Sequence, residues 1–474
     1  LAALGLAAPA AVVQAQEPNI APPGALTLEN IPPIPQRLAA EVQKYTEFKP
    51  TSFSDWHPQR MEMLISRRHQ NTTQIYRLSA PGTAPELLTD YPEPVRFASY
   101  QPTQGNFTLF NKDSGGNEVF RLYRAEMAGK PAAAIVSMPR QDHAQAISPQ
   151  DRRVQDFAWS TRGDRVVYST VPVNRSGSDD SVRMELHVVT PHSDPHANAG
   201  AGGKSRVLAE LPGGGWFGFT WSPDDKRLAM LEYISINQSH IWIMDTSTGV
   251  KRRLIESGAS EPVSYGKVRF SRDGKGLYTV TDRGAEFNRL TYIDLASLKH
   301  TPLTAEIPWD VQDFDVSLDG KLLAFVSNED GAGVLHLLRT RDRRLLDAPK
   351  LPLGTLSGVR WHRDSVNLAM TVSSAKSPAD VYSYNRKTGL LTRWTQHEPG
   401  GADPAAFVEP ELVRWKSFDG RSISGFIYRA PASRFPGKRP VLVNIHGGPE
   451  SQYRPGFAAR NNYFVNEMGI SMIW

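Results

Sequence analysis

The 474-residue sequence contains no cysteine, which excludes disulfide bonds, thiolate metal sites and a cysteine nucleophile. It also lacks a run of about 20 apolar residues, so we expect no membrane-spanning helix. Basic residues exceed acidic ones by only 54 to 49. The densest basic stretch, residues 339–344, is interrupted by Asp342 and has no stacking aromatics, so it predicts a solvated loop and no nucleic-acid partner. No pattern indicates a metal ion or another cofactor.

The N-terminal region differs in composition from the rest. Residues 1–15 form an apolar, alanine-rich run ending in Val-Gln-Ala before a polar pair, which resembles the end of a signal peptide. This pattern predicts a periplasmic or secreted protein; the alternative is a frayed alanine-rich tail. Residues 16–50 are rich in proline and end in a short amphipathic stretch, residues 36–48, that predicts a helix.

Residues 51–398 repeat one pattern, in which apolar or alternating runs are separated by turn residues, as in antiparallel strands. The clearest unit, Phe219 to Ala229, reads FTWSPDDKRLA. Another unit begins at Phe97. Seven units align on their second large residue at spacings of 44 to 62 residues, and these residues are Trp56, Tyr100, Trp159, Trp221, Phe270, Val316 and Trp361.

A period of this length with several strand-like runs per unit is typical of a β-propeller. A single unit cannot bury both of its faces, so neighbouring units must stack around a ring. We therefore predict an all-β, seven-bladed β-propeller over residues 51–398, with the repeated aromatic residues in the blade cores. Six or eight blades are the alternatives if one unit is wrongly divided.

The repeated sequence pattern ends at a glycine-containing linker, residues 396–401, and a different pattern follows it. Residues 413–417 and 423–428 predict two strands around an Asp-Gly turn, and residues 441–445 predict a buried strand of a parallel or mixed sheet. This strand runs directly into His-Gly-Gly-Pro at residues 446–449. Two glycines after a strand allow backbone N–H groups to approach a ligand without side chains in the way. The alternative is an ordinary tight turn.

The stretch from Val413 to Pro449 resembles the opening of the catalytic domain of the prolyl oligopeptidase family of serine peptidases, which includes dipeptidyl and acylaminoacyl peptidases. Residues 373–398 resemble the last propeller blade of the same enzymes. With the repeats, the similarity covers the chain from about Phe53 to Trp474. The resemblance implies that residues 405–474 begin an α/β-hydrolase domain, and that the substrate is a short peptide whose access the propeller restricts.

The resemblance also implies a mechanism. A serine in a Gly-x-Ser-x-Gly elbow attacks the peptide carbonyl, a histidine transfers the proton, and an aspartate orients the histidine. No Gly-x-Ser-x-Gly occurs in this sequence, so the serine, histidine and aspartate are all expected beyond Trp474. We therefore expect the chain as it stands not to hydrolyse peptides.

Three residues of the glycine motif are candidates for the oxyanion hole. By the resemblance, Gly448 supplies an oxyanion-hole N–H and Gly447 shapes the turn. His446 lies where some relatives place an oxyanion-binding tyrosine, with a histidine packed at the strand end as the alternative. It is not expected to be the triad base.

Two other groups of polar residues stand out. Arg283, Glu286 and Arg289 share one predicted propeller connection and are weaker candidates for gripping a substrate terminus, with a structural ion pair between strands as the alternative. His187, His192 and His196 surround a glycine- and alanine-rich stretch. These histidines predict solvated loop positions and no metal site, since a metal site needs a rigid scaffold and usually an acidic partner.

Two other functions fit parts of the sequence. A propeller that serves only as a binding or scaffold module fits the repeats, but it gives no reason for a hydrolase-like strand and glycine loop to follow. An esterase or lipase shares the His-Gly-Gly pattern but lacks the sevenfold repeat. The combination of both features favours the peptidase.

Overall fold

The computed structural model describes residues 18–127, 144–173, 182–191, 205–255, 261–398, 400–448 and 450–474. These ranges form eight four-stranded sheets, seven of which are antiparallel and built from successive strands. We call these seven sheets blades 1 to 7. Blade 1 contains β1 (Thr51–Trp56), β2 (Met63–His69), β3 (Thr72–Leu78) and β4 (Glu86–Leu87). Blade 2 contains β5 (Val95–Tyr100), β6 (Phe107–Lys112), β7 (Arg121–Glu126) and β8 (Ala144–Ala146). Blade 3 contains β9 (Arg152–Trp159), β10 (Val166–Pro172), β11 (Arg183–Val189) and β12 (Arg206–Pro212).

The other four blades have the same organisation. They are β13 (Trp216–Trp221), β14 (Arg227–Ser235), β15 (Gln238–Asp245) and β16 (Lys251–Arg253); β17 (Tyr265–Phe270), β18 (Gly276–Thr281), β19 (Arg289–Asp294) and β20 (His300–Pro302); β21 (Val311–Val316), β22 (Leu322–Glu329), β23 (Ala332–Arg339) and β24 (Arg344–Leu346); and β25 (Gly354–Trp361), β26 (Asn367–Ser374), β27 (Ser377–Asn385) and β28 (Leu390–Arg393).

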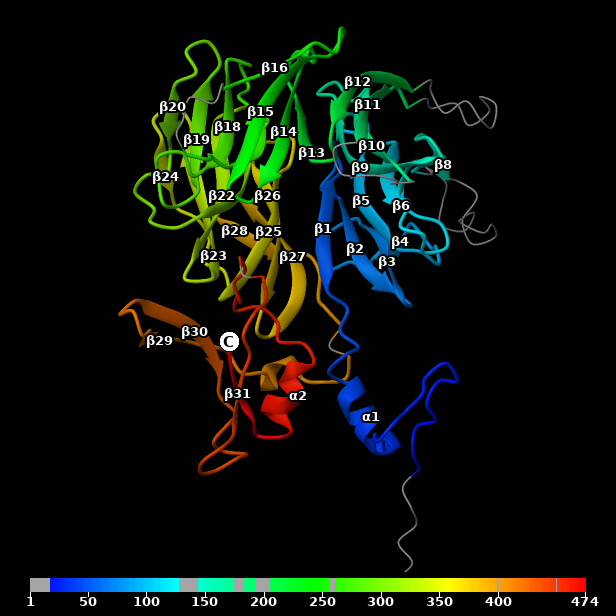
Figure 1. Ribbon diagram of the computed structural model, residues 1–474, viewed down its shortest axis with the longest axis vertical. Coiled ribbons are helices and arrows are strands. Elements are labelled where there is room, and N and C mark those ends of the chain that lie inside the picture. The colour runs from blue at the N-terminus through cyan, green and yellow to red at the C-terminus, as the bar shows by residue number, and fades with distance from the viewer. Residues whose placement is uncertain are drawn as a thin grey trace, which may run out of the picture.

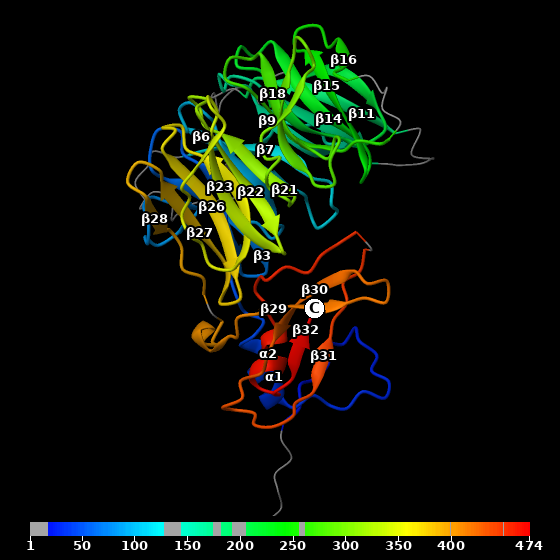
Figure 2. The same cartoon turned by 90° about the vertical axis from the view of Figure 1, so that its left-hand side faces the viewer.

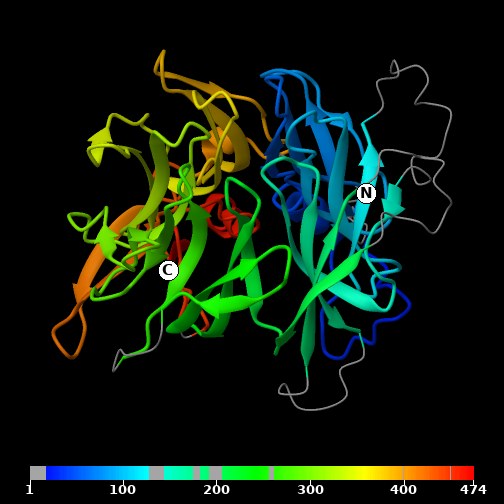
Figure 3. The same ribbon diagram turned by 90° about the horizontal axis from the view of Figure 1, so that it is seen from above.

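The blades stand side by side around a ring, seen from the side in Figure 1 and from above in Figure 3. The first strand of each blade is the innermost, and β1 contacts β25, so the first and last blades close the ring. The prediction of a β-propeller is confirmed.

The apolar residues of the repeat fill the spaces between blades. Seven separate clusters of buried side chains each combine residues of two neighbouring blades, including the pair formed by blades 7 and 1. Burying one large apolar side chain contributes about 1.5–3 kcal/mol, so no blade is stable without its neighbours. Phe97 is an exception to the predicted core, because its side chain is 69% exposed.

Two local interactions explain the repeated sequence pattern. In the first turn of blade 4, the Ser222 hydroxyl donates to Asp224 (2.6 Å) and accepts the N–H of Arg227 (2.9 Å), which closes the hairpin. The aromatic residue before the turn reaches the preceding blade, since the indole N–H of Trp221 donates to the carbonyl of Ala158 (3.1 Å). The same indole bond joins Trp56 to Arg360 across the closure of the ring.

The eighth sheet lies below the ring in Figure 1. It contains β29 (Glu411–Lys416), β30 (Ser422–Tyr428), β31 (Val441–Val443) and β32 (Ser471–Ile473), in the order β29-β30-β32-β31. Strands β31 and β32 are parallel, and the other pairs are antiparallel. Helix α2 (Asn461–Asn466) packs beside β32, and its Val465 joins a core with Tyr428 and Met472. We call residues 400–474 the C-terminal segment.

The chain before the propeller packs on the chain after it. Helix α1 (Gln36–Gln43) covers most of the predicted helix and ends before the turn at residues 44–46. Tyr45 then packs edge-on against Tyr463, and Phe48 against Phe457, with ring centroids 5.6 and 4.5 Å apart. Figure 2 shows this blue N-terminal region beside the red and orange C-terminal segment.

Candidate active site

The glycine motif follows β31, the third strand of the eighth sheet in chain order. The N–H of Asn444 still pairs with the carbonyl of Ile473 (2.8 Å), so strand pairing ends one residue before Ile445. His446, Gly447 and Gly448 are then exposed, while Pro449 lies outside the described residues. The loop therefore leaves the end of a strand with its backbone open to solvent.

Gly448 has a backbone conformation that other residues rarely adopt. Its φ angle is 151°, and a Cβ atom added to it would lie 2.8 Å from the backbone nitrogen of Glu450. By contrast, a Cβ atom on Gly447 would meet nothing within 4 Å, and its φ is not in the positive range. The conformation of the loop therefore requires glycine at position 448 and not at position 447.

His446 does not pack at the strand end. Its side chain is exposed, and Nδ1 lies 3.0 Å from the carbonyl oxygen of Gly447. Because a carbonyl oxygen only accepts, Nδ1 carries the proton of this hydrogen bond.

The expectation that residues 441–445 form a buried strand was wrong. Val441, Leu442, Val443 and Ile445 are 54%, 43%, 65% and 85% exposed. Within the described residues, β31 pairs with β32 alone. The described residues cover neither face of β31 at these positions.

Blade 6 holds the chain that follows the glycine motif. The Arg454 guanidinium donates from Nε to the carbonyl of Gly331 (2.8 Å) and from Nη1 to Gln312 (2.6 Å). The amide of Asn328 donates to Gln452 (2.7 Å). Burial lowers the pKa of Arg454. Sequence reasoning missed this contact, because polar residues in a Pro- and Gly-containing loop indicate a solvated segment.

Arg283, Glu286 and Arg289 occupy or border the connection between β18 and β19. The equivalent connection of blade 6, at Gly331, contacts Arg454, so this connection lies on the same face of the propeller as the C-terminal segment. Arg283 donates to the Tyr265 hydroxyl (3.4 Å), and no ion pair joins the three residues. The structural ion pair is therefore not present.

His187 is not a solvated loop residue, contrary to the sequence-based expectation. It lies on β11, is 4% exposed and stacks on Tyr168. Its ring nitrogens lie 3.1 Å from Thr170 Oγ1 and 3.2 Å from Ser205 Oγ, and burial lowers its pKa to about 4. Both faces of β11 pack against neighbouring blades, so the adjacent Leu186 and His187 are both buried. His192 and His196 lie outside the described residues.

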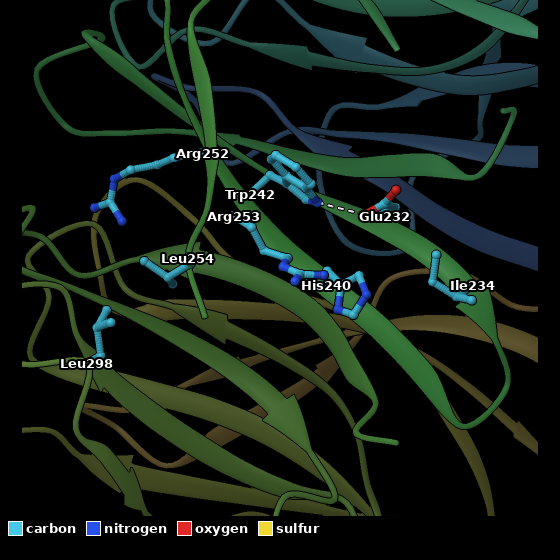
Figure 4. A pocket seen from close by; sticks show the side chains of 8 residues that line it. All are labelled: Glu232, Ile234, His240, Trp242, Arg252, Arg253, Leu254 and Leu298. Carbon is cyan, nitrogen blue, oxygen red and sulfur yellow. Dashed lines mark hydrogen bonds between the residues drawn. The ribbon is translucent and has the colours of Figure 1, made fainter. Parts of the chain in front are cut away.

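A separate hollow of about 820 Å³ opens on blade 4 (Figure 4). Trp242 lies in its wall and donates to Glu232 (2.8 Å), beside His240, whose pKa is lowered by burial. None of the residues predicted for the active site lines this hollow. Over the described ranges, no helix is long and apolar enough to cross a membrane, and no three His, Asp or Glu side chains gather as a metal would require.

The closed ring of antiparallel blades defines a β-propeller protein. Residues 150–397, more than half of the chain, match the protein family described as "Prolyl oligopeptidase, N-terminal beta-propeller domain". The chain belongs to the prolyl oligopeptidase family.

Two curated relatives are named as peptidases. The chain is 22% identical over 410 residues to prolyl endopeptidase of Elizabethkingia meningoseptica, covering 85% of this chain and 55% of the relative. It is 22% identical over 421 residues to dipeptidyl aminopeptidase BIII of Pseudoxanthomonas mexicana, covering 81% and 53%. The chain thus spans about half the length of the curated relatives it matches.

Solved structures share the fold. Prolyl oligopeptidase B from Galerina marginata superposes with a TM-score of 0.74 at 14% identity, over 92% of this chain and 63% of that one. A puromycin-hydrolysing peptidase of Mycobacterium tuberculosis gives a TM-score of 0.68 at 16% identity, over 92% and 67%.

Proposed function

We propose that this chain is the propeller and the first part of the catalytic domain of a serine peptidase that hydrolyses short peptides. The observation that carries the proposal is the backbone of Gly448, held in a glycine-only conformation directly after the third strand of the sheet that follows the propeller. In α/β-hydrolases, an N–H from this loop forms half of the oxyanion hole. The peptidase names of the two curated relatives support the same substrate class.

In the proposed reaction, a serine supplied by the sequence beyond Trp474 attacks the carbonyl carbon of a peptide. The negative oxygen of the tetrahedral intermediate then accepts a hydrogen bond from the N–H of Gly448. One such donor stabilises the transition state by about 3–4 kcal/mol. The proton moves to a histidine that an aspartate orients, and then to the leaving amine.

The propeller has a positioning role in this proposal. Blade 6 binds Gln452 and Arg454, a few residues after the glycine motif, so it limits how far the oxyanion loop can move. The connection that carries Arg283 and Glu286 lies on the same face. These side chains are therefore available to contact a substrate terminus while the ring restricts access to short peptides.

The test uses the protein extended through its downstream sequence. We expect it to be labelled by a fluorophosphonate probe and to hydrolyse a dipeptidyl or prolyl amide, whereas the chain ending at Trp474 does neither. Loss of labelling on replacing the serine of the downstream Gly-x-Ser-x-Gly by alanine identifies the nucleophile. Hydrolysis of esters without peptide amides would favour an esterase, and an extended protein that neither reacts with the probe nor cleaves amides would favour a scaffold propeller.

We also propose that the protein is exported to the periplasm or secreted. The support is the alanine-rich run and Val-Gln-Ala end of residues 1–15, which lie outside the described residues. Mass spectrometry of the N-terminus in the exported fraction is expected to find a chain that begins at Gln16. An intact alanine-rich run on protein confined to the cytoplasm would contradict the proposal.

A further inference from the structure

The innermost strands of several blades contain a β-bulge at the same place. The pairing shifts at this point in β5, β13, β17 and β25. In three of these strands the first bulged residue is glycine, namely Gly218, Gly266 or Gly358. In β5 it is Phe97.

The backbone of Phe97 has a conformation that suits glycine. Its φ angle is 53°, close to the 70° of Gly218 and the 64° of Gly358. A bulky residue in this left-handed region is an outlier whose side chain crowds its own backbone. The ring gains little from packing in return, since 69% of Phe97 is exposed. Strain combined with an exposed aromatic ring is typical of a residue kept for contact with a ligand.

The exposed ring of Phe97 lies in neither of the two interfaces that blade 2 forms with its neighbours. Strand β5 pairs only with β6, so its other edge borders the channel. Its Ala98 and Tyr100 are buried between blades 1 and 2, and its Ser99 accepts a hydrogen bond from Trp159 of blade 3 (3.0 Å), whereas Phe97 at the bulge is exposed on this innermost strand.

Phe97 also lies at the channel end nearest the candidate active site. It is the third residue of β5, and the second residue of the equivalent β21, Gln312, contacts Arg454 of the C-terminal segment. Figure 3 shows this red segment behind the ring when the propeller is seen from above.

Several charged side chains of the innermost strands form ion pairs across neighbouring blades. Lys267 Nζ lies 2.8 Å from Asp313, and Arg360 Nη1 lies 2.7 Å from Asp55. These paired charges leave the exposed ring of Phe97 free of competition from them, and an aromatic ring recognises apolar groups.

We propose that Phe97 binds an apolar side chain of a peptide at the mouth of the propeller channel. This inference rests on the proposed peptidase function, because it takes the ligand to be a peptide. The contact is a packing one, in which an aromatic or aliphatic side chain covers the exposed ring. It adds a specificity contact on the propeller, remote from Gly448.

The test measures binding to the chain as it stands, which requires no nucleophile. The probes are two fluorescein-labelled octapeptides of glycine and serine, one with a central phenylalanine and one with serine in its place. Fluorescence anisotropy is expected to show that the wild-type chain binds the phenylalanine peptide about three- to tenfold more tightly. In Phe97→Ala and Phe97→Gly this preference disappears, whereas Phe97→Leu keeps part of it.

Thermal unfolding separates the proposal from a structural role. We expect Phe97→Gly to melt about 1–3 °C higher than Phe97→Ala, because glycine relieves the strain while both variants lose the ring. Leu390→Ala, which removes an exposed apolar side chain from the outermost strand of blade 7, is the control that should keep the peptide preference.

Equal affinities of the wild-type chain for the two peptides, or no binding of either, would overturn the inference. So would a preference that survives in Phe97→Ala. Neither result bears on the proposed function, which the labelling of the extended protein tests on its own.

Discussion

Asp55 of blade 1 and Arg360 of blade 7 form an ion pair of 2.7 Å across the place where the propeller ring closes. The other carboxylate oxygen of Asp55 accepts the N–H of Tyr100 in blade 2 (2.9 Å). One carboxylate therefore links three successive blades. No strand is shared between the first and last blades, so side chains such as these must hold the ring closed.

Replacing this carboxylate should weaken the whole propeller. We expect Asp55→Ala to lower the free energy of unfolding by about 2 kcal/mol, because it leaves a backbone N–H and a partly buried guanidinium without their partner. Glu411→Ala breaks an exposed ion pair with Arg429 and is expected to cost less than about 1 kcal/mol. Urea unfolding measures the free energy of unfolding of both variants. An equal decrease in the two would contradict the role of Asp55 in closing the ring.

His57 makes stability depend on pH. It is fully buried, its Nδ1 accepts the N–H groups of Gln59 and Arg60 (both 3.1 Å), and burial lowers its pKa to about 4. The unfolded chain takes up the proton near the ordinary pKa of about 6.5, so stability is constant above that pH and falls as the pH drops toward 4.

The titration of this single histidine lowers the free energy of unfolding by about 3 kcal/mol at pH 4. His57→Asn keeps an acceptor for the two N–H groups and removes the titration. The variant should therefore lose less stability than the wild type between pH 6.5 and pH 4, measured by urea unfolding at each pH. The pKa of His187 is lowered as well, and His187 is present in both the wild type and the variant. If the stability of the two proteins falls equally with pH, His57 is not responsible for the pH dependence.

Arg454 should hold the C-terminal segment against blade 6. We expect Arg454→Met to remove both of its hydrogen bonds and to speed amide exchange in residues 444–456 about tenfold, measured by hydrogen–deuterium exchange. The matched control is Arg460→Met, which changes an exposed arginine of the same segment. If exchange is as slow in Arg454→Met as in the control, blade 6 does not restrain the loop that carries Gly448.

The propeller could be predicted because its pattern is local. The turn bonds of Ser222 join residues two and five positions apart, and the contact of Trp221 with the preceding blade recurs because each unit repeats the same residues. The strand before His446 was predicted for the same reason.

The rest depends on contacts between distant parts of the chain. The bonds from Arg454 to Gln312 and Gly331 join residues more than 100 positions apart, and no periodicity marks them. The sequence of β5 matches the repeat and predicts that Phe97 is buried, but the bulge turns the ring out. The apolar sequence of β31 predicts burial, but no element among the described residues packs on its two faces.

The loop after β31 is proposed to supply an oxyanion-hole N–H, and two neighbouring glycines allow this role to be measured. In the extended protein, Gly448→Ala forces a Cβ atom to within 2.8 Å of the Glu450 nitrogen, whereas the same change at Gly447 meets nothing within 4 Å. Both residues are exposed, so Gly447→Ala should leave the melting temperature unchanged and Gly448→Ala should lower it only through local strain in the loop.

The measurement is kcat/KM for a dipeptidyl or prolyl amide in the two variants. We predict that Gly448→Ala lowers it by about 10²- to 10³-fold, while Gly447→Ala lowers it less than about tenfold. Hydrolysis by Gly448→Ala at the wild-type rate would contradict the account.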